Sequence, residues 1–97
     1  MTDDFFAPPP FDPEAALQRL RTDLRGAGLV ERAGVWELRA MPAVRLRIDG
    51  PAIHAELVKQ LTRSPTWQAH VLSQSAQQRE FVALVKKKIQ AWSDRDD

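Results

Sequence analysis

Three arginines recur at even spacing between apolar residues in the stretch VWELRAMPAVRLRIDGPAI, residues 35–53. They are Arg39, Arg45 and Arg47. Because successive side chains of a strand point to opposite faces, a β-ribbon would direct all three away from the core. Such a row can recognise an acidic partner. It can equally be a solvated face on which the long arginine stems cover the sheet.

Two tight turns are expected to bring this row together, a loop at residues 41–43 and the hairpin dipeptide Asp49-Gly50. These turns would place Arg39 opposite Arg45, and Arg45 opposite His54. Like charges that face each other across strands destabilise a sheet by a few tenths of a kcal/mol up to about 1 kcal/mol. An acidic partner would offset this repulsion. The predicted charged binding residues are therefore Arg39, Arg45, Arg47 and His54.

Two apolar residues are expected beside the arginines. A loop at residues 62–66 would place Val58 and Leu72 on the same outward face. Apolar side chains among charges are typical of an interface. The sequence thus favours a small non-enzymatic interaction module, adaptor-like or chaperone-like, that docks an acidic protein on an open sheet face. A symmetric homodimer through this face is an alternative.

A nucleic-acid-binding protein is the second alternative. The chain carries 14 basic and 13 acidic residues, but residues 1–12 and 93–97 hold six of the acidic and one of the basic ones. That leaves 13 basic against 7 acidic residues in the body, a net charge of +6. The chain has one basic run, Lys86-Lys87-Lys88. A helix would spread these lysines over most of a turn, with Lys88 near the apolar stripe. The footprint of this alternative is Arg45, Arg47, Lys86, Lys87 and Lys88.

No pattern typical of catalysis, metal binding or cofactor binding occurs. The chain has no cysteine, and neither an HExxH motif nor a glycine-rich phosphate loop can be found. The predicted register separates His54 and His70 by roughly 13 Å along neighbouring strands, too far for one ion. We therefore expect no enzyme, no metal and no cofactor.

Size and composition indicate one globular domain. The 97 residues are 43% hydrophobic and 28% charged, which is ordinary for a folded chain. No apolar run approaches the roughly 18 to 20 residues of a membrane span, and the first ten residues are acidic and proline-rich rather than signal-like. We expect a cytoplasmic protein that does not insert in membranes. The abundance of Ala and Arg suggests a bacterial source.

The expected domain covers residues 12–92, between an acidic, proline-rich tail at 1–11 and an acidic tail at 93–97. A helix is predicted at 13–25, capped by Asp12 and ended by Gly26. A second is predicted at 76–92, with Ser75 and Gln78 as a capping box. The tail phenylalanines are expected either to fold back onto the domain or to form a linear motif; they are Phe5, Phe6 and Phe11.

Between the helices the hydrophobic period is two, with a loop expected at residues 32–34 and a last strand at 67–73. Residues 51–62 also fit a helix by spacing and propensity, but the register of the neighbouring turns favours a strand. The fold class is α+β, an antiparallel meander of four or five strands in the order α-β-β-β-β-β-α with both helices on one face. The residues expected to face inward are Val30, Trp36, Leu38, Ala40, Val44, Leu46, Ile48, Trp67, Ala69 and Val71.

Overall fold

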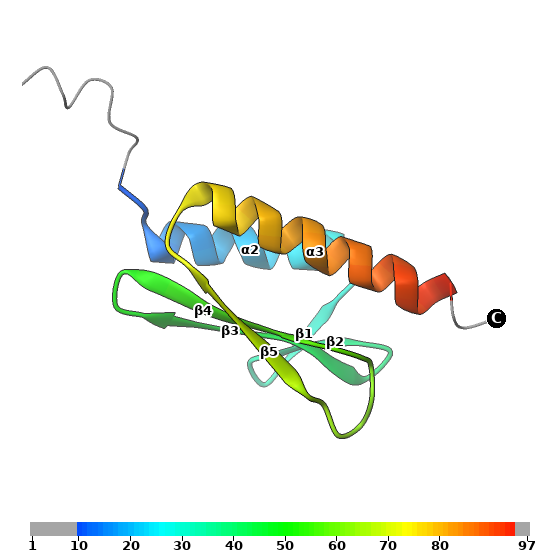
Figure 1. Cartoon of the computed structure of the whole chain (residues 1–97). Helices are drawn as coiled ribbons and strands as arrows, with labels where there is room; N and C mark the ends of the chain where they lie inside the picture. The colour runs from blue at the N-terminus through cyan, green and yellow to red at the C-terminus, as the bar shows by residue number, and fades with distance from the viewer. Residues whose placement is uncertain (1–9, 95–97) are drawn as a thin grey trace, which may run out of the picture.

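The computed structural model describes residues 10–94 and contains an antiparallel meander of five strands between two helices (Figure 1). The strands follow one another in the sheet in chain order, and both helices lie on one side of it. This confirms the predicted α+β fold, while residues 1–9, with Phe5 and Phe6, and residues 95–97 lie outside the described part. The elements are α2 (Pro13–Gly26), β1 (Val30–Arg32), β2 (Val35–Leu38), β3 (Met41–Asp49), β4 (Ala52–Val58), β5 (Trp67–Leu72) and α3 (Ser75–Asp94).

The first helix begins as the sequence predicts and ends at Gly26, one residue later than predicted. The carboxylate of Asp12 accepts hydrogen bonds from the backbone N–H groups of Glu14 and Ala15, at 3.1 and 3.3 Å. Gly26 belongs to the helix, and Gly28 instead takes the left-handed conformation with φ 100°. The N–H of Leu29 then bonds to the carbonyl of Leu24 at 3.1 Å, the pattern of a Schellman motif.

Two hairpin turns place non-glycine residues at positive φ. Ala33 and Gly34 have φ 53° and 83°, and Arg39 and Ala40 have φ 55° and 66°, as a type I′ turn requires at both central positions. The predicted three-residue loops at 32–34 and 41–43 are therefore wrong. As a result Val30 points outward and is 64% exposed.

A β-bulge sets the register between β2 and β3. Leu38 pairs with Met41 and Glu37 with Pro42, but Trp36 pairs with Val44, so the register shifts between Trp36 and Glu37. The shift keeps Trp36 and Val44 together in the core, with 1% and 0% of their surface exposed. The predicted pairing of Arg39 with Arg45 is wrong, because Arg45 pairs with Val35.

The hairpin between β3 and β4 turns at Gly50 and Pro51, one residue after the predicted dipeptide. Gly50 has φ 61° and proline holds a negative φ, the combination of a type II′ turn. Leu46 consequently pairs with Ala55 rather than with Ile53. Because the shift is by two residues, the inward set is unchanged. Residues 52–58 form a strand, so the helical alternative for this segment is excluded.

The register between β4 and β5 differs from the prediction by an odd number, which exchanges the two faces of β5. Val58 pairs with Trp67, and the loop between the strands runs from residue 59 to 66. His70 and Leu72 therefore face the helices. Trp67, Ala69 and Val71, expected in the core, lie on the opposite, open face.

The second helix covers the same face of the sheet as the first. Its buried apolar residues are Phe81, Val82, Val85 and Trp92. The predicted capping box is wrong: the side-chain oxygen of Gln77, not Gln78, accepts hydrogen bonds from the backbone and hydroxyl of Ser73, at 2.8 and 3.1 Å. The buried residues are Ala16, Leu20, Leu24, Leu29, Trp36, Ala43, Val44, Ala52, Ile53, Ala55, Leu57, Val58, Leu72, Gln78, Phe81, Val82, Val85 and Trp92.

The structure also tests the expectations about the tail phenylalanines and about membrane insertion. Phe11 is half-buried and packs against the core, so this one phenylalanine folds back. No helix within residues 10–94 combines the length and the apolar character that crossing a bilayer requires.

The first turn offers a test of the register. Ala33→Asn is expected to raise the free energy of unfolding by about 0.5–1 kcal/mol, because asparagine followed by glycine tolerates the positive φ that alanine resists. Thermal unfolding should then shift upward by a few degrees. The control is Ala27→Asn, since Ala27 has φ −82° and no such strain. An equal gain at both positions would contradict the assigned turn.

Candidate functional site

The face of the sheet opposite the helices carries charged residues beside apolar ones. Cross-strand pairing joins Val35, Arg45, Glu56 and Ala69 in one row across β2–β5. A second row across β3–β5 consists of Arg47, His54 and Val71. We call this surface, defined by these seven residues together with Trp67, the open face.

Arg45 is fixed by contacts within the open face. Its Nη2 lies 3.0 Å from Oε1 of Glu56, and its Cζ lies 4.0 Å from the ring centroid of Trp67. Since Trp67 is on β5, the guanidinium group extends across β4 to reach it. The direct neighbours of Arg45 are Val35 and Glu56, so the predicted repulsion from Arg39 and His54 does not occur. Arg45 thus contributes to sheet packing as well as to surface charge.

Arg47 forms a small polar network with His54 and Asp49. Nη2 of Arg47 lies 3.3 Å from Nδ1 of His54, and Nε2 of His54 lies 3.2 Å from Oδ2 of Asp49. A guanidinium group only donates hydrogen bonds, so in this contact Nδ1 of His54 is the acceptor, and Nε2 donates to Asp49. Both ring nitrogens of His54 are therefore engaged, while Arg47 keeps 64% of its side chain exposed.

A shallow depression of about 320 Å³ lies beside these arginines. β2 begins at Val35, which pairs with Arg45, so β3 has no neighbouring strand on that side beyond Arg45. The turn at Ala33 and Gly34 borders the resulting space, and the rest of its lining is Val35, Arg45, Leu46, Arg47, His54 and Glu56. An anionic side chain in this depression would find two guanidinium groups, and each already has a carboxylate nearby: Glu56 lies 3.0 Å from Arg45, and Asp49 lies 4.0 Å from Arg47.

The structure brings together three of the six predicted partner-binding residues. Arg45, Arg47 and His54 share the open face. Val58 pairs with Trp67 but is 0% exposed, so it cannot contact a partner directly. Arg39 lies in the turn after β2, outside the rows.

Leu72 was predicted on the open face and lies on the helix-covered side, only 3% exposed. Trp67 and Val71 take the place that the sequence assigned to Leu72. Periodicity alone assigned them to the core, because Trp67, Ala69 and Val71 form an unbroken alternating apolar set, whereas only Leu72 of the other set is apolar. The register of β5 against β4 determines which set faces the helices.

The residues predicted for the nucleic-acid alternative do not form one surface. Arg45 and Arg47 lie on the open face, whereas the lysine run lies on α3, on the other side of the sheet. Lys88 is half-buried, as expected near the apolar stripe, and its Nζ donates to the carbonyl of Lys59 at 3.3 Å. Lys86 and Lys87 are exposed.

The two histidines point to opposite faces of the sheet. His54 belongs to the open face, and His70 lies beneath α3 with its ring centroid 5.4 Å from that of Phe81 in an edge-to-face contact. The predicted register instead placed both histidines on the outward face, roughly 13 Å apart along neighbouring strands. Throughout residues 10–94, no three potential metal-ligating side chains of histidine, cysteine, aspartate or glutamate lie together.

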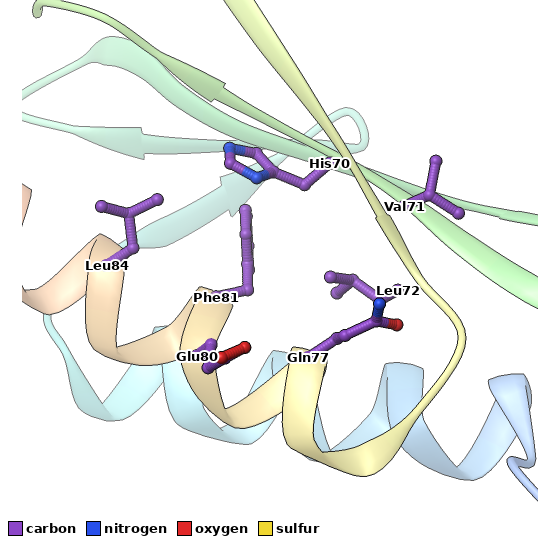
Figure 2. Close-up of a pocket in the computed structure, with 7 residues that line it drawn as sticks. All are labelled: His70, Val71, Leu72, Gln77, Glu80, Phe81 and Leu84. Carbon is purple, nitrogen blue, oxygen red and sulfur yellow. The ribbon is translucent and has the colours of Figure 1, made fainter.

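A groove between β5 and α3 is the second concave feature (Figure 2). Its volume is about 240 Å³, and His70, Phe81 and Leu84 border its inner end. The remaining lining residues are Val71, Leu72, Gln77 and Glu80. Nε2 of His70 is buried there without a hydrogen-bond partner among the described residues.

Neither concave feature can be assigned by likeness to another protein. Both are shallow. His54, beside the depression, has both ring nitrogens in polar contacts, and Nε2 of His70, beside the groove, is buried. The chain matches no protein-family model, no curated protein and no solved structure.

Proposed function

We propose that the protein is a non-enzymatic interaction module that binds an acidic segment of another protein on its open face. The observation that supports this most directly is the exposed guanidinium group of Arg47 beside the depression. Arg45 provides the second cation at the same place. The acidic side chain would enter between the Ala33-Gly34 turn and β3.

Apolar residues of the open face support a protein rather than a small anion as partner. Val71 is 53% exposed at the end of the row that begins with Arg47. Val35 and Ala69 flank Arg45 and Glu56 in the adjacent row. Charges that confer specificity and apolar side chains that exclude water are the usual components of a protein interface.

The polar network supports binding rather than catalysis. A general base needs an unoccupied nitrogen within reach of substrate, and both nitrogens of His54 are occupied by Arg47 and Asp49. The open depression also exposes any bound group to water, which catalytic sites normally exclude. The lack of cysteine fits the cytoplasmic location that we propose for this module.

The test is binding of a labelled peptide in which glutamate alternates with valine, measured by fluorescence anisotropy at low salt. Arg47→Ser is expected to weaken binding by roughly tenfold or more, because it removes a charge-assisted hydrogen-bond donor that carries about 1.5–3 kcal/mol. Lys86→Ser is the matched control. It removes the same charge from the other side of the sheet and should leave the affinity unchanged.

Two results would contradict the proposal. One is absence of peptide binding at low salt, where surface electrostatics are strongest. The other is tighter binding of a single-stranded oligonucleotide that Lys86→Ser weakens and Arg47→Ser does not. That second pattern would identify a phosphate-binding surface on α3.

A further inference from the structure

The outer edge of β5 is a long strand edge without the usual protection. Native proteins guard sheet edges with charged residues, prolines or very short strands, since unpaired backbone groups otherwise recruit further strands. β1, at the other edge, has three residues and includes Glu31 and Arg32. β5 has six residues, WQAHVL, and none of them is a lysine, arginine, aspartate, glutamate or proline. The asymmetry indicates that the β5 edge is covered in the functional state.

Apolar surface adjoins this edge on both sides of the sheet. On the open face Val71 is 53% exposed and Ala69 is also exposed. On the helix side, the half-buried Leu84 borders the groove between β5 and α3 beside Phe81, which is itself only 3% exposed (Figure 2). A strand added here would gain backbone hydrogen bonds and bury apolar side chains on both of its faces.

We infer that the occupant of this edge is a second copy of the chain, with β5 paired antiparallel to β5 about a two-fold axis. A register centred on Ala69 places each Val71 directly beside Trp67 of the second copy. Pairs of an aromatic and a β-branched residue are among the favourable cross-strand combinations. The two sheets then form one continuous antiparallel sheet, and both copies keep their helices on the same side.

The charges of α3 argue for a second copy rather than an unrelated peptide. Residues Glu80, Leu84 and Lys87 follow one another at helical spacing on one stripe, and the first two line the groove. His70 of β5 contacts Phe81 of α3, and both residues line the groove together with Leu84. Since His70 follows Ala69, through which the proposed axis passes, this turn of α3 lies nearest the axis.

A two-fold axis makes the two α3 helices antiparallel. Leu84 then meets Leu84, while Glu80 of each copy meets Lys87 of the other. Neither Glu80 nor Lys87 has an ion pair inside the part of the chain that the structure covers. The stripe is therefore complementary to itself, as an isologous interface requires.

This interface shares Val71 and Ala69 with the open face but none of the charged residues proposed to bind an acidic partner. It uses the β5 edge and α3, whereas the acidic partner would use Arg47 and the depression beside β3. Arg47→Ser is accordingly expected to leave the dimer intact. The two proposals can therefore be tested separately, and the failure of one does not contradict the other.

Sedimentation equilibrium of the full chain tests the inference. We expect twice the 11.0 kDa of the chain for the wild type and the mass of one chain for Val71→Arg, which puts a charge into the apolar contact. Val30→Arg is the matched control, since Val30 is 64% exposed on the opposite edge strand and should retain the dimer. A single-chain mass for the wild type, or a dimer that Val71→Arg leaves intact, would overturn the inference.

Disulfide crosslinking tests the register directly, because the chain contains no cysteine. Ala69→Cys is expected to form an intermolecular disulfide under mild oxidation, as two Cα atoms directly opposite in antiparallel strands lie about 4.5–5.5 Å apart. Val30→Cys should remain largely unlinked at the same concentration. Equal crosslinking of the two variants would contradict the β5 pairing.

Discussion

Trp36→Ala is expected to lower the free energy of unfolding by about 3–5 kcal/mol, the usual loss when a buried tryptophan is truncated to alanine. Trp36 is only 1% exposed, and the Cζ atom of Arg25 lies 5.8 Å from its ring centroid. A domain of this size has a total stability of about 5–15 kcal/mol, so the variant loses a large share of it. Urea unfolding followed by circular dichroism measures the loss.

The matched control is Trp67→Ala, because the sequence assigned both tryptophans to the core. Trp67 is half-buried on the open face and stacks against Arg45. Its replacement is expected to cost less, about 1–2 kcal/mol, from the cation–π contact and partial apolar burial. Equal losses for the two variants would contradict the assignment of Trp67 to the open face.

Leu72→Ala is expected to lower the free energy of unfolding by about 2–5 kcal/mol. Leu72 is 3% exposed and belongs to the core between β5 and α3. Its removal leaves a cavity beneath the second helix. The folded fraction should still bind the acidic peptide, because Leu72 does not reach the open face. Chemical denaturation and peptide titration measure the two effects separately.

Val71→Ala provides the comparison for Leu72→Ala, since the two residues are adjacent on β5 and face opposite sides. In dilute solution, where copies of the chain are separated, this exposed position is expected to change stability by no more than about 0.5 kcal/mol. The register predicted from the sequence requires the opposite result, a larger loss of stability for Val71→Ala than for Leu72→Ala. A larger loss for Val71→Ala than for Leu72→Ala would therefore refute the observed pairing of β4 with β5.

The amino-acid sequence was sufficient to predict the order of the elements. Asp12 and Pro13 mark the start of α2, and alternation of apolar residues identifies the strands. These signals act over a few residues, through backbone capping and the period of side-chain directions. For the same reason Arg45, Arg47 and His54 could be assigned to one face, because shifts of the β3–β4 register by two residues leave the faces unchanged.

Only the tertiary structure decided which apolar residues of β5 enter the core. From Trp67 to Leu72 one alternating set of positions is wholly apolar, whereas in the other set only Leu72 is apolar, so periodicity alone favours the orientation opposite to the one observed. Packing of α3 against His70 and Leu72 selects one orientation, and this choice buries Leu72 while exposing Val71. The bulge beside Trp36 is likewise a consequence of packing, since local turn chemistry alone would pair Trp36 with Ala43. Local preferences thus determined the elements and most of their faces, whereas the burial of apolar surface between sheet and helices fixed the registers.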